Sequence, residues 1–74
     1  MDKTIGEIIR ENRLRLKKTQ AELAQMLGVT RQAVVWWETD KVVPERNIKN
    51  LEEVFGMPPG SLYVMLNYVK DSKD

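Results

Sequence analysis

Gly28 is the residue that most constrains this chain, because it stands between two short segments that each carry a helix-start signal. The first segment opens with TQAE at residues 19–22, where the threonine and the glutamate have the spacing of a capping box. Thr30 can cap the second segment, which we expect to be helical to about Thr39. Glycine permits a left-handed backbone, so the chain can turn sharply at Gly28. The sequence therefore predicts two short helices joined by a tight turn.

The residues around this turn suit two helices that cross closely. Ala24 is small enough for a close approach, and Val29, Val34 and Trp37 fall at offsets that can point into the crossing. A small residue, a glycine turn and apolar residues at these offsets are typical of a helix-turn-helix. A plain helical hairpin is the alternative, and the capping signals together with the offsets favour the helix-turn-helix.

Three further helices complete the predicted fold. TIGE at residues 4–7 has the capping-box spacing and starts the first helix. Apolar residues three and four positions apart mark the fourth and fifth helices: Ile48, Leu51, Val54 and Phe55, then Leu62, Met65, Leu66 and Val69. We therefore expect an all-α chain of five short helices, one domain over residues 1–74, with a frayed tail at residues 71–74.

The residue types exclude several classes of function. The chain has no cysteine and no histidine, so we expect no disulfide framework, no metal site and no cofactor. The commonest general base is absent as well, and no nucleophile has an obvious base beside it, so we expect no enzyme activity. No apolar run approaches the roughly 18 residues that span a membrane, and no leader opens the chain. We expect a cytoplasmic protein.

Residues 19–38, TQAELAQMLGVTRQAVVWWE, resemble the Cro/C1-type helix-turn-helix family, also called the XRE family. The family pattern is Thr-Gln-x-x-Leu-Ala-x-x-x-Gly-Val-Ser/Thr, followed by a helix that ends in Trp or Ile and then Glu. The matching positions are Thr19, Gln20, Leu23, Ala24, Gly28, Val29, Thr30, Val34, Trp37 and Glu38. The resemblance covers roughly residues 5–66 and implies a lambda-repressor-like DNA-binding domain in a bacterial or phage-infected cell.

The resemblance also implies roles for individual residues. Gln20 would donate to a DNA phosphate, and Arg31 and Gln32 would reach base edges in the major groove. The full set of implied DNA contacts is Lys17, Lys18, Gln20, Thr30, Arg31, Gln32, Val35, Trp36 and Lys41. Arg13 would instead form a structural ion pair with Glu38. The spacing supports that pair, because Arg13 shares the inward face of Ile9 and Glu38 lies four residues after Val34.

Val35 and Trp36 are unusual on a DNA-reading helix, where the family more often has polar residues. Valine can only touch a thymine methyl group, and an indole can pack on a sugar or donate one hydrogen bond. An exposed Val-Trp pair beside an arginine is also typical of a protein-binding hot spot. The alternative protein-binding surface comprises Arg31, Gln32, Val35, Trp36, Val42 and Val43. A third interpretation is that Trp36 only folds over Val42 or Val43.

Four positions depart from the family pattern. Lys17 and Lys18 replace a glycine and an apolar residue before the second helix, so Lys17 must adopt a strained or different turn. Asp40 replaces a glycine after the third helix, and its charge would lie near DNA if that loop approached a phosphate. Glu52 stands where the fourth helix usually has a small apolar residue.

Two functions remain open from the sequence. The first is a sequence-specific regulator of a phage or prophage lytic-lysogenic switch, bound as a dimer to an inverted repeat in double-stranded operator DNA. The second is an antirepressor or modulator that docks the same helix on a partner repressor protein. The candidate contacts of a homodimer are Leu62, Tyr63, Met65, Leu66 and Val69, although burial in the core is the alternative for Leu62 and Leu66.

Overall fold

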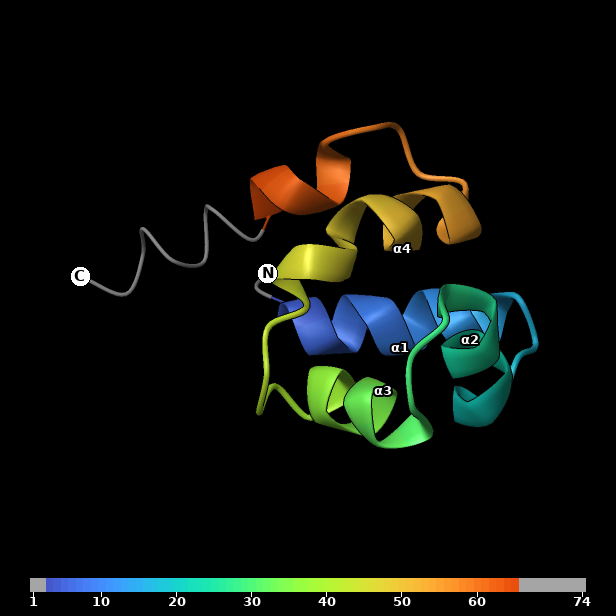
Figure 1. The fold of residues 1–74 in the computed structure, drawn as a ribbon. Coiled ribbons are helices and arrows are strands. Elements are labelled where there is room, and N and C mark those ends of the chain that lie inside the picture. Colours follow the sequence, from blue (N-terminus) through green and yellow to red (C-terminus); the bar gives the residue numbers. More distant parts are fainter. Residues whose placement is uncertain (1–2, 66–74) are drawn as a thin grey trace.

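The structure, a computed structural model, describes residues 3–65 as a set of short helices (Figure 1). They are α1 (Ile5–Arg15), α2 (Gln20–Leu27), α3 (Arg31–Glu38), the 3-10 turn η1 (Glu45–Asn47) and α4 (Ile48–Phe55), followed by helical residues 61–65. Residues 3–65 contain no strand. The predicted all-α fold of five short helices is confirmed, and η1 is an additional element outside the predicted helices. The predicted tail at residues 71–74, like Leu66 and Val69, lies outside the described residues.

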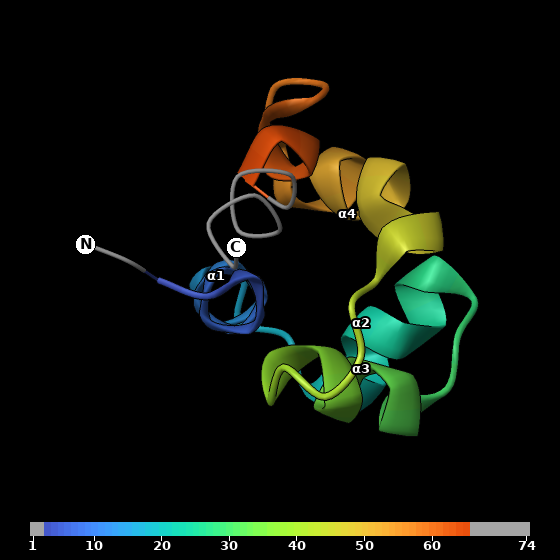
Figure 2. The same cartoon turned by 90° about the vertical axis from the view of Figure 1, so that its left-hand side faces the viewer.

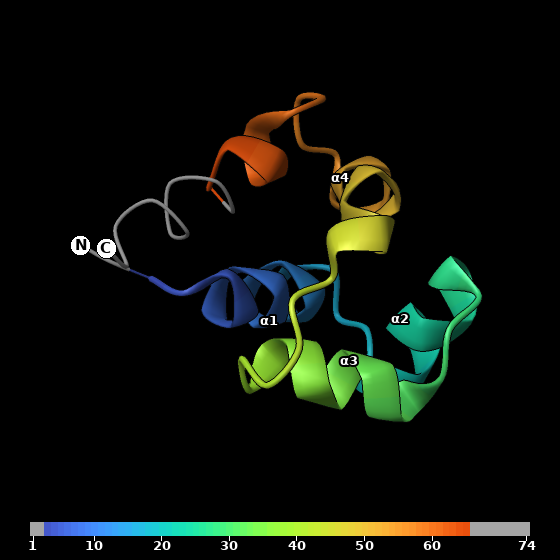
Figure 3. The same cartoon turned by 60° about the vertical axis from the view of Figure 1, so that its left-hand side comes forward.

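α1 lies between α3 on one side and α4 with residues 61–65 on the other (Figures 1 and 3). α3 packs against both α1 and α2, and α2 also contacts α4. Viewed along α1, the helices surround a common centre (Figure 2). That centre is filled by the apolar side chains Ile5, Ile8, Ile9, Leu23, Ala24, Val34, Trp37, Ile48, Leu51, Phe55 and Leu62. Since these residues come from every α-helix, burial of one shared core orients α3.

Three threonines start the first three helices. Thr4, Thr19 and Thr30 have extended backbones, and each hydroxyl accepts the N–H of the residue three positions later, at 3.0 to 3.2 Å. The side chains of Glu7 and Glu22 return the bond, each accepting the N–H of its threonine at 2.9 and 2.8 Å. Both predicted capping boxes are therefore confirmed. They satisfy backbone donors that the first turn of a helix leaves unpaired.

Each of the four helices is followed by a residue with a left-handed backbone. Gly28 and Gly56 have φ values of 71° and 70°, while Lys17 and Asp40 reach 59° and 61°. Lys17 donates its N–H to the carbonyl of Leu14 at 2.9 Å, so the chain folds back over the end of α1. Glycine adopts this conformation freely, whereas a side chain there costs about 1–2 kcal/mol. The strained turn expected at Lys17 is therefore present.

Gly6 and Asp40 join the start of α1 to the end of α3. The N–H of Gly6 donates to Oδ1 of Asp40 at 3.0 Å. A Cβ atom at Gly6 would lie 2.5 Å from the carbonyl oxygen of Trp37, so only glycine permits this close approach. The carboxylate of Asp40 is thus bound by the first turn of α1, where the helix dipole favours a negative charge.

Glu52 binds the backbone at the beginning of the helical segment at residues 61–65. Its buried carboxylate accepts N–H groups from Gly60 and Leu62, both at 2.9 Å, and from Tyr63 at 3.2 Å. The bond from Gly60 has the largest effect. Together the three bonds favour the ionised carboxylate and hold the pKa of Glu52 below its ordinary value. The acid that departs from the family pattern therefore caps residues 61–65 and ties them to α4.

Replacing Trp37 with alanine should lower the free energy of unfolding by about 3–5 kcal/mol, because its side chain fills the core and is only 4% exposed. Urea or thermal unfolding measures this loss. Trp36→Ala is the matched control, since the neighbouring indole is 44% exposed and its removal should change stability by no more than about 0.5 kcal/mol. Equal losses from the two variants would contradict this division between core and surface.

Candidate nucleic-acid interface

α3 presents two chemically different faces. Val34, Trp37 and Glu38 are buried against α1 and α2. Arg31 and Gln32, in the first turn of α3, are exposed, as is Trp36, whereas Val35 is only half-buried. Because α3 forms one edge of the molecule (Figure 3), its exposed residues can reach a partner without any movement of the core. The outward set therefore consists of two polar side chains followed by an indole.

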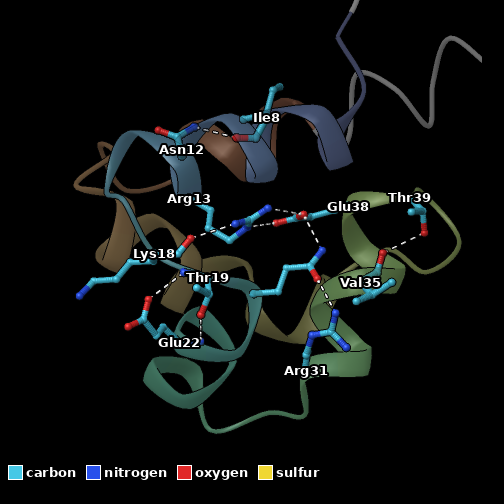
Figure 4. A network of polar contacts seen from close by, with 11 residues as sticks. Ile8, Asn12, Arg13, Lys18, Thr19, Glu22, Arg31, Val35, Glu38 and Thr39 are labelled. Carbon is cyan, nitrogen blue, oxygen red and sulfur yellow. Dashed lines mark hydrogen bonds and ion pairs between the residues drawn. The ribbon is translucent and has the colours of Figure 1, made fainter.

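A buried ion pair fixes α3 to α1. Arg13 Nε lies 2.6 Å from Glu38 Oε2, and Arg13 Nη2 donates to Glu38 Oε1 at 3.1 Å (Figure 4). The third nitrogen of the guanidinium, Nη1, donates to the carbonyl oxygen of Lys18 at 2.9 Å. Arg13 therefore connects α1, α3 and the turn before α2. Each of its three nitrogens donates within the protein and its side chain is only 10% exposed, so Arg13 is not part of the exposed face.

Gln20 connects this pair to the exposed face. Its Nε2 donates to Glu38 Oε1 at 3.1 Å, and its Oε1 accepts from Arg31 Nη2 at 3.3 Å. The side chain that the family resemblance assigns to a DNA phosphate is therefore engaged within the protein. Its backbone N–H at the start of α2 remains placed for an anion.

Exposed basic residues lie in the turns next to α2 and α3. Lys17 and Lys18 are exposed in the turn before α2, and Lys41 is exposed in the loop after α3. Thr30 is also exposed, although its hydroxyl is occupied in capping α3. Arg46, which no sequence pattern singles out, is an exposed basic residue that η1 places at the rim of a groove beside this loop. Pro44, which precedes η1, is the signal that could have indicated a turn there.

An apolar surface adjoins the polar face. Trp36, Val42 and Val43 are 44%, 42% and 45% exposed. The N–H groups of Lys41 and Val42 both donate to the carbonyl of Trp36, at 2.9 and 3.3 Å, so the loop folds back over the end of α3. We call Trp36, Val42 and Val43 the indole patch. The two valines also line a shallow groove with Val29, Ala33, Trp37 and Pro44.

The candidate dimer contacts fall into different environments. Leu62 is fully buried in the core and so takes no part in an intermolecular contact. Tyr63 is exposed and Met65 is half-buried against the core. Leu66 and Val69 lie outside the described residues.

The described residues offer few other chemical possibilities. Within residues 3–65 there is no group of three or more histidine, cysteine, aspartate or glutamate side chains arranged to hold a metal ion. None of the helices in that range is both long and apolar enough to cross a bilayer. The surface therefore presents a short helix with exposed Arg, Gln and Trp side chains, and basic side chains lie in the neighbouring turns.

Comparison with protein families finds that a model described as "Helix-turn-helix" matches residues 9–62. The match includes α2, the turn at Gly28 and the whole of α3. Comparisons with curated proteins and with solved structures return no significant match.

Replacing Arg13 with methionine should lower the free energy of unfolding by about 3–5 kcal/mol, because it leaves the buried carboxylate of Glu38 without its cation. Chemical unfolding of the single variant measures that cost. The double variant Arg13→Met with Glu38→Leu should recover a large part of it, since both charges are then absent. A single variant as stable as the parent would contradict a structural role for the pair.

Proposed function

This chain belongs to the Cro/C1-type helix-turn-helix family, and from that membership we propose that it is a sequence-specific transcription regulator that reads the major groove of DNA with α3. The family is one of DNA-binding regulators rather than enzymes. The observation that carries the finer proposal is the division of α3, with Val34 and Trp37 buried while Arg31 and Gln32 are exposed at its start. An α-helix fits the major groove and reads bases with residues near its N-terminus.

The side chains on this face match the chemistry of base edges. Arginine can donate two parallel hydrogen bonds to guanine, and glutamine can both donate to and accept from adenine. Lys17, Lys18 and Lys41 would bind phosphates, which gives affinity and position but no sequence information. Trp36 would pack on a sugar or a thymine methyl group next to the bases that Arg31 and Gln32 contact.

We extend the proposal to a homodimer that acts in a phage or prophage genetic switch. The support for the switch is the resemblance of residues 19–38 to Cro/C1-type regulators. A dimer would bind an inverted repeat whose half-sites lie about 34 Å apart, one turn of the double helix. Tyr63 and Val64 are exposed on the helical segment at residues 61–65 and would belong to the dimer interface.

Arg31→Ala should weaken the preference for guanine at one operator position by about 1–3 kcal/mol. The operator is first selected from a pool of random duplexes, and the affinities of its single-base variants are then measured at several salt concentrations. Lys49→Ala is the control, because it removes an exposed basic side chain from α4. That helix and α3 lie on opposite sides of α1. An Arg31→Ala protein whose base preferences match those of the parent would contradict the reading role.

A second candidate function is favoured by the indole patch. Three exposed apolar side chains, two of which line a groove together with Arg46, suit a protein partner better than a phosphate backbone. In this case α3 would dock on a repressor, and the chain would act as an antirepressor or modulator.

The second candidate predicts that the regulator encoded by a neighbouring gene is retained on the immobilised protein, and that Trp36→Ala weakens retention by about 2 kcal/mol or more. Retention should persist at high salt, because apolar contacts are not screened. Leu14→Ala is the matched control, since Leu14 is similarly exposed on α1. No retention, or equal loss from both variants, would count against a partner at the indole patch.

A further inference from the structure

We propose that Glu38 is a positioning residue for DNA reading: through the amide of Gln20 it orients the guanidinium of Arg31, so that the buried ion pair also sets base specificity. This inference deepens the proposed function and rests on it. It assigns to Glu38, which cannot itself reach DNA, an effect on which base the protein prefers.

Three consecutive contacts carry the proposal. Arg13 holds the Glu38 carboxylate through Oε2 at 2.6 Å and Oε1 at 3.1 Å. The same Oε1 accepts Nε2 of Gln20 at 3.1 Å, and Oε1 of Gln20 accepts Nη2 of Arg31 at 3.3 Å. In Figure 4 this chain of contacts runs from Arg13 at α1 to Arg31 at the start of α3. It begins in the core, where the Glu38 side chain is 3% exposed, and ends at the surface.

The charge of Glu38 fixes which way the Gln20 amide points. An ionised carboxylate only accepts hydrogen bonds, so the amino group of Gln20 must face Glu38. The carbonyl oxygen of Gln20 then necessarily faces Arg31, and it attracts the guanidinium. If the amide were reversed, its N–H groups would face a cation that has donors only. The buried carboxylate of Glu38 therefore ensures that the Gln20 amide presents an acceptor oxygen to Arg31.

This contact leaves Arg31 free to read a base. A guanidinium has five N–H donors, and the contact to Gln20 uses one of them, so two remain for guanine. A side chain already held in place loses less conformational freedom when it binds, and this gain applies only to the base that accepts both bonds in that orientation. We therefore expect a stronger preference for guanine over the other bases, and not tighter binding to every DNA sequence.

The first experiment measures specificity in Gln20→Met, a variant with a side chain of similar length and no hydrogen-bonding amide. Preference for guanine at the position read by Arg31 should fall by about three- to tenfold. Gln25→Met is the matched control, since Gln25 is exposed on the same helix about 140° away and its side chain makes no hydrogen bond within residues 3–65. It should leave the preference unchanged.

A double-variant cycle shows whether Gln20 acts through Arg31. In an Arg31→Ala background, Gln20→Met should have no further effect on base preference, because there is no guanidinium left to orient. If Gln20→Met instead weakens binding to all operator variants equally, Gln20 serves a phosphate only and the proposal is overturned.

A measurement without DNA separates failure of this proposal from failure of the proposed function. In the free protein, the NMR order parameter of the Arg31 Nε–H should fall in Gln20→Met and in Glu38→Gln, and stay at the parent value in Gln25→Met. Order parameters that are the same in all four proteins would overturn the contact, even if Glu38→Gln is less stable. A parent protein that binds no DNA would overturn the proposed function and the reading role together, whatever the order parameters show.

Discussion

The ion pair between Arg13 and Glu38 is the interaction on which the rest of the structure depends. Two charges removed from water are costly unless each finds complete hydrogen bonding, and here the pair is bonded through both carboxylate oxygens. That requirement acts together with the shared apolar core to fix the distance and rotation of α3 relative to α1. The same carboxylate also binds Gln20 of α2. The Glu38 carboxylate of α3 is therefore bound by side chains of both α1 and α2, and these bonds help to place the helix that presents the exposed face.

Much of the fold follows from short local signals. The capping boxes at Thr4 and Thr19 and the left-handed turn at Gly28 depend on residues within a few positions of one another, so the sequence alone predicts them. The close contact at Gly6 depends on atoms more than thirty residues away in the chain, so no local sequence pattern predicts it. The capping of residues 61–65 by Glu52 escapes prediction for the same reason, since a lone acid in a helix gives no indication of which donors surround it.

The exposed face was predictable as a set of positions and not as a set of contacts. Helical periodicity separates Trp36 from Trp37 correctly, because a rotation of about 100° moves a side chain from core to surface. Periodicity carries no information about polar partners, so the engagement of the Gln20 amide between Glu38 and Arg31 needs coordinates. Val35 shows a further limit. It shares the outward side by register, yet neighbouring atoms leave it half-covered.

The adjacent tryptophans give this molecule two optical reporters on consecutive residues. The emission of an indole depends on how much water surrounds it, so Trp37 responds when the interior opens and Trp36 responds when something covers the outer side of α3. Phenylalanine at either position isolates the signal of the other. Docking and unfolding can then be followed separately by fluorescence in the same chain, without an attached dye.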